Sequence, residues 1–169
     1  MKHLTEPIRA IHFLVLAFLM TLSSPIVAQD FQKGLAAFQA GDYATALQEW
    51  TPLAEAGLAQ AQTSLGFMYN NGNGVLQDYK EAVKWYRLAA EQGTASAQTN
   101  LGFMYEYGHG VLQDNTMAHM WYNIASANGF EKAGGFRDEL AGLMTSADIS
   151  KAQAMARECM NSGYTKCGY

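Results

Sequence analysis

Basic residues are scarce in this chain of 169 residues, and their scarcity narrows the range of possible functions. The sequence has 11 Lys and Arg against 15 Asp and Glu, and the basic residues form no cluster. Nucleic acids and anionic lipid surfaces are bound by clustered positive charge. The composition therefore predicts neither a nucleic-acid-binding protein nor a protein that binds anionic membranes.

Groups that could bind a metal or carry out catalysis are equally scarce. Beyond residue 28 the only histidines are His109 and His119, which lack the i, i+4 spacing that places two ligands on one helix face. We expect surface or loop roles for both, and no metal site. No Gly-x-Ser-x-Gly or Ser-x-x-Lys sequence occurs in this part of the chain. We therefore expect no catalytic residues and no cofactor.

An apolar run long enough to span a membrane is also lacking. The run Ile11–Leu22 falls short of the ~20 residues that a span needs, follows a basic start and precedes a small residue at Ala28. These features predict a secretory signal peptide over residues 1–28, cleaved before Gln29, with an uncleaved anchor as the alternative. The mature chain would have 141 residues and a formal charge of −5, because two basic residues and one acidic residue are removed. We expect it to be periplasmic or secreted, without stable membrane insertion.

What the sequence does contain is a repeat of 36 residues. Residues 59–94 and 95–130 align without gaps and are identical at 20 of 36 positions. Both copies share the run Leu-Gly-Phe-Met-Tyr and, after two residues, the run Gly-x-Gly-Val-Leu-Gln-Asp. Self-similarity at this period is typical of proteins built from stacked structural units.

Each copy predicts two helices joined by a turn. In the first copy, apolar residues fall on one helix face across residues 59–69, and Gly72 then ends this helix. Asp78 suits the N-cap of a second helix, and Gly93 follows the end of that helix. One hairpin cannot bury its apolar face alone, so we expect neighbouring hairpins to stack.

A glycine lies inside the first helix of each copy and needs a compensating contact, because glycine in a helix costs about 1 kcal/mol relative to alanine. We expect Gly66 and Gly102 to permit the close approach of an aromatic side chain, which in the first copy is Trp85 or Tyr86. The aromatic residues that recur at repeat positions are expected to form the core rather than a cofactor site. They are Trp50, Trp85, Trp121, Tyr69, Tyr86, Tyr105 and Tyr122.

The regions on either side continue the pattern less regularly. Gly34 matches Gly66 within a predicted helix over residues 31–38, and Asp42 is placed to cap a second helix, so a degenerate repeat precedes the two full copies. After them we expect a helix over residues 131–143 and a last helix from Thr145, whose spacing to an acidic residue is that of a capping box, to about residue 161. The predicted organisation is a signal peptide (1–28), a degenerate repeat (29–57), two repeats (58–93 and 94–129) and a C-terminal cap (130–169).

The repeated residues resemble a known family. The pattern Ala-x-Ala-x-x-x-Leu-Gly-x-x-Tyr-x-x-Gly-x-Gly-Val-x-x-Asp, followed by Ala-x-x-Trp-Tyr-x-x-Ala and a closing Gly, is similar to the Sel-one-like repeat (SLR), a relative of the tetratricopeptide repeat. The resemblance implies an all-α, right-handed α/α solenoid that scaffolds or adapts other proteins, usually without catalysis. The C-terminal sequence also resembles the tails of exported bacterial members.

Cys159 and Cys167 are the only cysteines of the chain. An even pair so close together in an exported protein predicts a disulfide that would hold the C-terminal tail against the last helix. A redox or metal pair is the alternative reading. The spacing is not Cys-x-x-Cys, however, and no histidine lies nearby.

The first helices combine a polar face with one phenylalanine each. Phe67 and Phe103 lie about 160–200° from the preceding leucines on a helical wheel. In a solenoid the first helices line the concave surface, so this face could bind a peptide through an aromatic anchor. Packing on the next hairpin is the alternative, and near-complete burial of both rings would decide for it. The candidate partner-binding residues are Gln60, Thr63, Ser64, Phe67, Asn71, Ser96, Thr99, Asn100, Phe103 and Tyr107.

Together these features predict an exported protein–protein interaction module of the bacterial cell envelope, a scaffold or adaptor rather than an enzyme. Its partner would be a protein or peptide. Two alternatives stay open: a structural or stress-related envelope component without a dedicated ligand, and a hydrolase of cell-wall material or β-lactams. The hydrolase is suggested by resemblance to cysteine-rich relatives, from which a chain with two cysteines departs. No motif specifies the oligomeric state.

Overall fold

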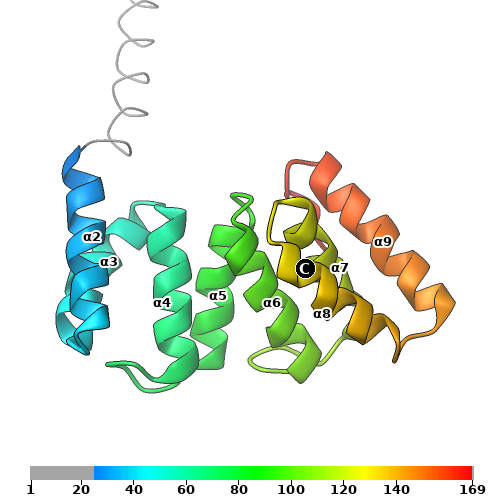
Figure 1. The fold of residues 1–169 in the computed structure, drawn as a ribbon, viewed down its shortest axis with the longest axis horizontal. Helices are drawn as coiled ribbons and strands as arrows, with labels where there is room; N and C mark the ends of the chain where they lie inside the picture. Colours follow the sequence, from blue (N-terminus) through cyan, green and yellow to red (C-terminus); the bar gives the residue numbers. More distant parts are fainter. Residues whose placement is uncertain (1–24, 169) are drawn as a thin grey trace, which may run out of the picture.

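A computed structural model describes residues 25–168, and this part of the chain folds into eight α-helices without a strand. Figure 1 shows the helices side by side in a row along the long axis of the molecule. The predicted all-α stack of helix hairpins is confirmed. The helices are α2 (Pro25–Gln39), α3 (Tyr43–Glu55), α4 (Ala59–Asn71), α5 (Tyr79–Ala90), α6 (Ala95–Tyr107), α7 (Asn115–Ala127), α8 (Glu131–Ala141) and α9 (Ser146–Asn161).

Successive helices pair into hairpins as far as α7, and the last two helices are arranged differently. Helices α2 and α3, α4 and α5, and α6 and α7 pack on each other within their hairpins, and α3–α4 and α5–α6 contacts join the hairpins. Helices α8 and α9 both pack on α7. The C-terminal pair thus covers the end of the stack, as expected of a cap.

The hairpin turns follow from the repeated aspartates and glycines. Gly72 and Gly108 end α4 and α6 in the left-handed conformation, with φ of 71° and 69°, which glycine adopts without a steric penalty. Asp78 accepts hydrogen bonds from two backbone N–H groups at the start of α5, and Asp114 does the same for α7. These side chains accept hydrogen bonds from backbone N–H groups that a helix leaves unpaired at its start. The second helix of each hairpin therefore begins at a defined residue.

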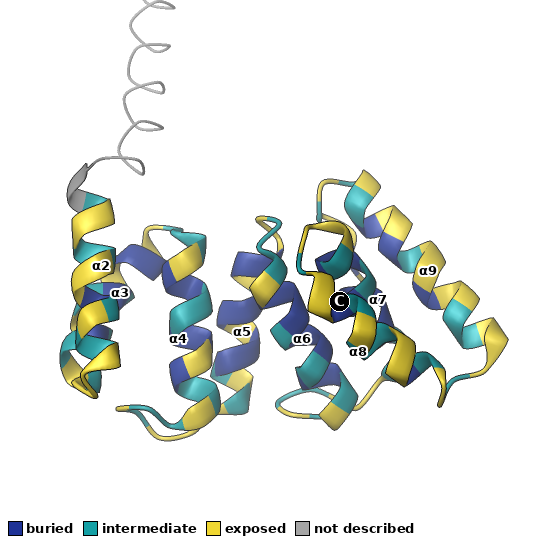
Figure 2. Ribbon diagram, viewed as in Figure 1, coloured by how far each residue is buried: buried dark blue, intermediate teal, exposed yellow. Residues whose placement is uncertain are grey.

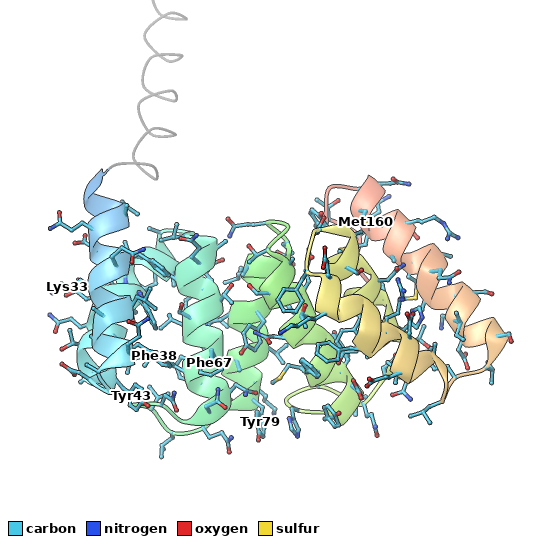
Figure 3. All side chains as sticks on the ribbon, in the orientation of Figure 1. Lys33, Phe38, Tyr43, Phe67, Tyr79 and Met160 are labelled. Atoms are coloured by element: carbon cyan, nitrogen blue, oxygen red, sulfur yellow. A yellow bond between two sulfur atoms is a disulfide. The ribbon has the colours of Figure 1, made fainter. Side chains whose placement is uncertain are left out.

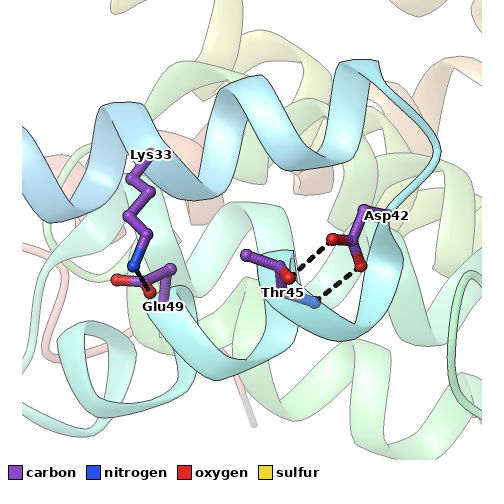
Figure 4. A network of polar contacts seen from close by, with 4 residues as sticks. All are labelled: Lys33, Asp42, Thr45 and Glu49. Atoms are coloured by element: carbon purple, nitrogen blue, oxygen red, sulfur yellow. Dashed lines mark hydrogen bonds and ion pairs between the residues drawn. The ribbon is translucent and has the colours of Figure 1, made fainter.

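The degenerate first repeat also has an aspartate that caps its second helix (Figure 4). Asp42 accepts hydrogen bonds from the backbone N–H and the hydroxyl group of Thr45, at the start of α3. An ion pair between Lys33 and Glu49 joins α2 to α3. The side chain of Lys33 is mostly exposed, so solvent screens this pair and packing remains the main link between the two helices.

The glycines inside the first helices permit the close contacts that the sequence predicts. A Cβ atom on Gly66 would lie 2.6 Å from the ring of Tyr86, and one on Gly102 would overlap the ring of Tyr122. In the first copy the partner is therefore Tyr86 and not Trp85. Gly34 meets Trp50 in the same way, with a Cβ distance of 2.5 Å. Each hairpin thus closes on an aromatic ring laid against a glycine.

The core consists of two clusters of buried residues. One runs from α5 to the C-terminal tail and includes Trp121 and Tyr122, both fully buried; the other joins α2, α3 and α4 to Trp85 of α5. Tyr69 is half-buried and contacts both clusters. The other six predicted core aromatics are buried. Figure 2 shows many buried residues along α5, whereas α9 at the end of the stack has many exposed ones.

Two helix boundaries differ from the predictions. Helix α2 begins at Pro25 rather than at Phe31, and proline suits a first helical turn because its missing N–H would have no partner there. The predicted cleavage point after Ala28 falls within α2, and residues 1–24 of the predicted signal peptide lie outside the described residues. Helix α8 ends at Ala141, two residues early. Within residues 25–168, every helix is too short or too polar to cross a membrane.

The predicted disulfide between Cys159 and Cys167 is present, and both cysteines are buried. Between them Tyr164 has a positive φ of 66°, and its hydroxyl group hydrogen-bonds to the side-chain amide of Asn128. The tail is therefore held on α9 by the disulfide and also reaches the end of α7.

Candidate functional site

Three adjoining hollows lie on the side of the stack formed by the first helices of the hairpins. We call them the N-terminal, central and C-terminal hollows, and together they form the groove. The N-terminal hollow, of about 230 Å³, is lined by Leu35, Phe38, Trp50, Thr63, Ser64, Phe67 and Asn100. The central hollow, of about 210 Å³, is lined by Phe67, Asn70, Tyr86, Asn100, Phe103, Met104, Tyr107 and His109. The C-terminal hollow, of about 280 Å³, is lined by Phe103, Glu106, Tyr107, Phe136, Glu139, Leu140 and Leu143.

Phe67 and Phe103 separate the hollows. Phe67 borders both the N-terminal and the central hollow, and this residue is 44% exposed. Its ring meets the edge of Phe38 at a centroid distance of 5.9 Å, and Figure 3 shows the two side chains directed toward each other between α2 and α4. Phe103 is half-buried and contacts Phe136 at 4.9 Å and Tyr122 at 5.5 Å. Neither ring shows the near-complete burial that would make packing its whole role.

The helical period explains why these two phenylalanines reach the groove. Leu65 and Leu101 are buried in the core, and a residue two positions later on a helix points to the opposite side. The intervening Gly66 lies against the core ring of Tyr86 and adds no side chain of its own. An aromatic ring therefore projects from each of the two first helices on the side away from the core.

Four of the predicted polar and aromatic residues also line the groove. Thr63, Ser64 and Asn100 lie at the N-terminal hollow, and Asn100 reaches the central hollow as well. The hydroxyl group of Thr63 donates its hydrogen to the carbonyl of Ala59 in the same helix, so this hydroxyl group can only accept a hydrogen bond from a partner. Tyr107, 59% exposed, stands between the central and C-terminal hollows.

The other four predicted residues do not line the hollows. Thr99 is only 3% exposed and donates its hydroxyl to the carbonyl of Ala95, so it lies beneath the surface and presents no group to a partner. Gln60 and Ser96 are exposed but outside the three hollows. Asn71 is exposed at the end of α4, where its amide donates to the carbonyl of Phe67.

Two carboxylates give the C-terminal hollow a negative charge. The hydroxyl group of Tyr122 donates to Oε2 of Glu106 at 2.6 Å. The charge of Glu106 and a hydrogen bond with it raise the pKa of the exposed Tyr107, to which Glu139 also contributes. Among the residues that line the three hollows there is no lysine or arginine. The groove is thus apolar at one end and acidic at the other.

Sequence reasoning missed several groove residues. Leu35 could have been found, because the alignment of Gly34 with Gly66 places it at the position of Phe67. The same alignment places Phe38 at the position of Asn70, whereas Phe136 has no such signal, since α8 lies outside the repeats. Glu139 lies on α8 and enters the groove only through the packing of α8 on α7.

The two histidines have different environments. His109 is exposed in the loop before α7, as expected, and stacks on Tyr79 with a centroid distance of 4.4 Å. The surface or loop role predicted for His119 is wrong: it is 2% exposed, and its Nδ1 atom has no hydrogen-bond partner among the described residues. Burial lowers its pKa, and the charge of Arg137 lowers it further. Its counterpart Val83 is also buried, so the position belongs to the core.

Comparison with known proteins agrees with the fold. The family model of the Sel1 repeat matches residues 59–94 and 95–130. A crystal structure of a protective antigen present in uropathogenic Escherichia coli strains, which displays an SLR fold, is similar with 26% identity and a TM-score of 0.77. That match covers 87% of this chain and 33% of the antigen, so this chain spans one third of that protein. No curated protein matches.

A second solved structure is similar over nearly its whole length. It is a Sel1 repeat protein from Oxalobacter formigenes, with 32% identity and a TM-score of 0.62, and the match covers 74% of this chain and 97% of that one. The repeats, the hairpin stack and this similarity agree with one another. The chain belongs to the Sel1 repeat family.

Proposed function

We propose that this protein is an exported interaction module of the bacterial cell envelope, a scaffold or adaptor that binds a protein or peptide partner in the groove. Sel1 repeat proteins are generally protein-interaction modules and typically non-catalytic scaffolds. The observation that carries the proposal is the position of Phe67. It is a large aromatic side chain, 44% exposed, at the junction of two hollows.

The physical basis is the energy gained when a partner covers this surface. Apolar surface removed from water contributes about 25 cal/mol per Å², and a few aromatic anchors commonly dominate binding, at more than about 1 kcal/mol each. Phe67 and Phe103 supply such anchors. Ser64 and Asn100 lie beside them and offer hydrogen-bonding groups for a peptide backbone. An aromatic anchor with polar neighbours suits an extended segment of a partner.

Two observations support export. The disulfide between Cys159 and Cys167 is of the kind that persists in oxidising compartments. Residues 1–28 have the composition of a secretory signal. N-terminal sequencing of the protein isolated from the periplasm should give a chain that begins at Gln29. Recovery of the chain from the cytoplasm with its first residues intact would contradict this part of the proposal.

Affinity capture from periplasmic extract tests the interaction itself. The double variant Phe67→Ala/Phe103→Ala should lose partners that the wild type retains. The matched control is Leu76→Ala/Leu112→Ala, because these leucines are 92% and 91% exposed at equivalent positions of the two hairpin loops and line none of the three hollows. The control should keep all partners. Identical partner lists for both double variants and the wild type would remove the groove as the binding surface.

A further inference from the structure

We propose that the groove receives an extended peptide in one orientation, with apolar side chains in the N-terminal hollow and a lysine or arginine side chain in the C-terminal hollow. This inference rests on the proposed function and specifies the chemistry of the partner. It follows from the different linings of the two end hollows and from the central hollow that adjoins both.

The C-terminal hollow suits a long basic side chain. Its volume of about 280 Å³ is at the lower limit of small-molecule sites, which is appropriate for a single side chain. Phe103 and Phe136 form aromatic walls, and Glu106 and Glu139 provide carboxylates. Lysine and arginine have apolar stems that pack on such walls, and cations are attracted to aromatic faces as well as to carboxylates.

The two carboxylates are available to a partner. Glu106 is oriented by the hydroxyl group of Tyr122, which donates to Oε2 at 2.6 Å, and by a hydrogen bond with Tyr107; each carboxylate oxygen has two lone pairs, so both can accept a further donor. Within residues 25–168, neither Glu106 nor Glu139 forms an ion pair with a lysine or arginine. Both charges act on the exposed Tyr107 between them, since both raise its pKa. A cation that enters this hollow would meet two uncompensated negative charges.

The opposite end has no charged lining residue. Leu35, Phe38 and Phe67 give the N-terminal hollow an apolar surface. At the repeat position where the second copy has Glu106, the first copy has the neutral Asn70. The charge is therefore confined to one end of the groove, which distinguishes the two directions in which a peptide could lie.

The three hollows adjoin one another, and this favours a peptide over a small amine. Phe67 and Asn100 are shared by the N-terminal and central hollows, and Phe103 and Tyr107 by the central and C-terminal hollows. A ligand that fills both ends must pass through the centre. An extended chain, which advances about 3.3 Å per residue, can do so, whereas a free amine fills only the acidic end.

Selection from a library of random peptides tests the inference on the oxidised mature chain. Peptides of about 12 residues are long enough, because they extend to roughly 40 Å. The enriched peptides should carry a lysine or arginine at a fixed distance, and on a fixed side, from a pair of apolar residues. Their affinities are then measured by fluorescence anisotropy for the wild type and for variants with unchanged thermal melting.

Glu106→Gln/Glu139→Gln should weaken binding about tenfold at low salt, because it removes two partly exposed charge interactions while keeping the shapes of the side chains. The difference should shrink at about 1 M salt. Glu55→Gln/Glu158→Gln is the matched control, since it changes the net charge equally at exposed residues outside the groove. The control should bind as the wild type does.

Three results would overturn the inference. Peptides that require Phe67 and Phe103 but carry no basic residue and bind Glu106→Gln/Glu139→Gln normally would leave the proposed function intact and refute the charge preference. A selection that yields no peptide dependent on the phenylalanines would refute the proposed function as well. A dimer in sedimentation that Phe67→Ala/Phe103→Ala dissociates would show that a second copy of the chain occupies the groove.

Discussion

Residues 59–94 and residues 95–130 form two hairpins of the same structure, yet the two hairpins differ at the end of the first helix. Both copies lay a tyrosine ring against a glycine, and both start their second helix with a capping aspartate. The last two residues of this helix differ: Asn70 and Asn71 in the first copy correspond to Glu106 and Tyr107 in the second. The internal contacts of the hairpin are thus reproduced, whereas the residues at the end of its first helix change in charge and size.

The copies also share a hydrogen bond between the two helices of the hairpin, and only the second copy extends it. The side-chain amide of Gln92 donates to Gln62, and at the same place in the next copy Asn128 donates to Gln98, both at 2.8 Å. Asn128 also bonds to Tyr164 of the tail. The tail is therefore hydrogen-bonded to the second copy, whereas the ring of the same tyrosine only approaches Gly93 at the end of the first copy.

The largest expected loss of stability comes from substitutions that break the contact between glycine and tyrosine that both copies share. Gly66→Leu and Gly102→Leu should each lower the free energy of unfolding by about 3 kcal/mol or more, because a side chain there overlaps a buried tyrosine ring. Thermal unfolding measures the change. Gly135→Ala is the control, since nothing lies within 4 Å of a Cβ at that helical position, and it should stabilise by about 0.5–1 kcal/mol. A melting temperature of Gly66→Leu equal to that of the wild type would disprove the glycine contact.

The next effect separates the two copies through the tail. Replacing both cysteines, Cys159→Ser/Cys167→Ser, should lower stability by about 2–3 kcal/mol, because the unfolded chain gains the entropy that the short disulfide loop removes. Hydrogen exchange should increase in α7, whose end bonds to Tyr164, more than in α5. Equal increases in the two helices would show that the tail does not support the second copy selectively.

A pH-dependent effect follows from a buried position at which the copies differ, with Val83 in the first copy and His119 in the second. Burial lowers the pKa of His119 below 6.5, so the unfolded chain binds more protons than the folded chain around and below that pH. Stability from this residue is fully present above the unfolded pKa and is lost as the pH falls toward the folded one. His119→Val, which restores the residue of the first copy, should therefore melt higher than the wild type, with a gap that widens from about pH 7.5 to about pH 5. A gap independent of pH would contradict the assignment.

The smallest effect concerns the exposed leucines of the hairpin loops. Leu76→Ala/Leu112→Ala should change the free energy of unfolding by no more than about 0.5 kcal/mol, because both side chains are almost fully exposed. Chemical denaturation of the two single variants should also give equal results if the two copies have equivalent loops. A large loss in only one variant would reveal a contact that the comparison does not contain.

The fold could be predicted because it depends on local patterns that recur. Gly66 with its aromatic partner, the cap at Asp78 and the turn at Gly72 each require neighbours within one repeat, and the disulfide joins residues eight apart. The groove could be predicted only in part. Phe67 and Phe103 follow from the helical period, but Glu139 enters through the packing of a helix that lies outside the repeats.

Burial was the other limit. The helical wheel places Thr99 on the polar face, but the residue is buried, and its hydroxyl group is satisfied within its own helix. His119 was misjudged because a polar residue occupies a core position, which its apolar counterpart Val83 would have indicated. Both cases depend on the packing around the residue, which the polarity of the residue itself does not indicate.

Site-specific photo-crosslinking in cells that export the protein tests the central claim most directly. A photoreactive phenylalanine analogue is placed at residue 67 or 103 in the groove and, for comparison, at residue 76 or 112 in the loops. If the groove binds the partner, positions 67 and 103 should give the same crosslinked product, and the loop positions should give none. Products from the loop positions alone would contradict the claim and place the interaction surface on the hairpin loops.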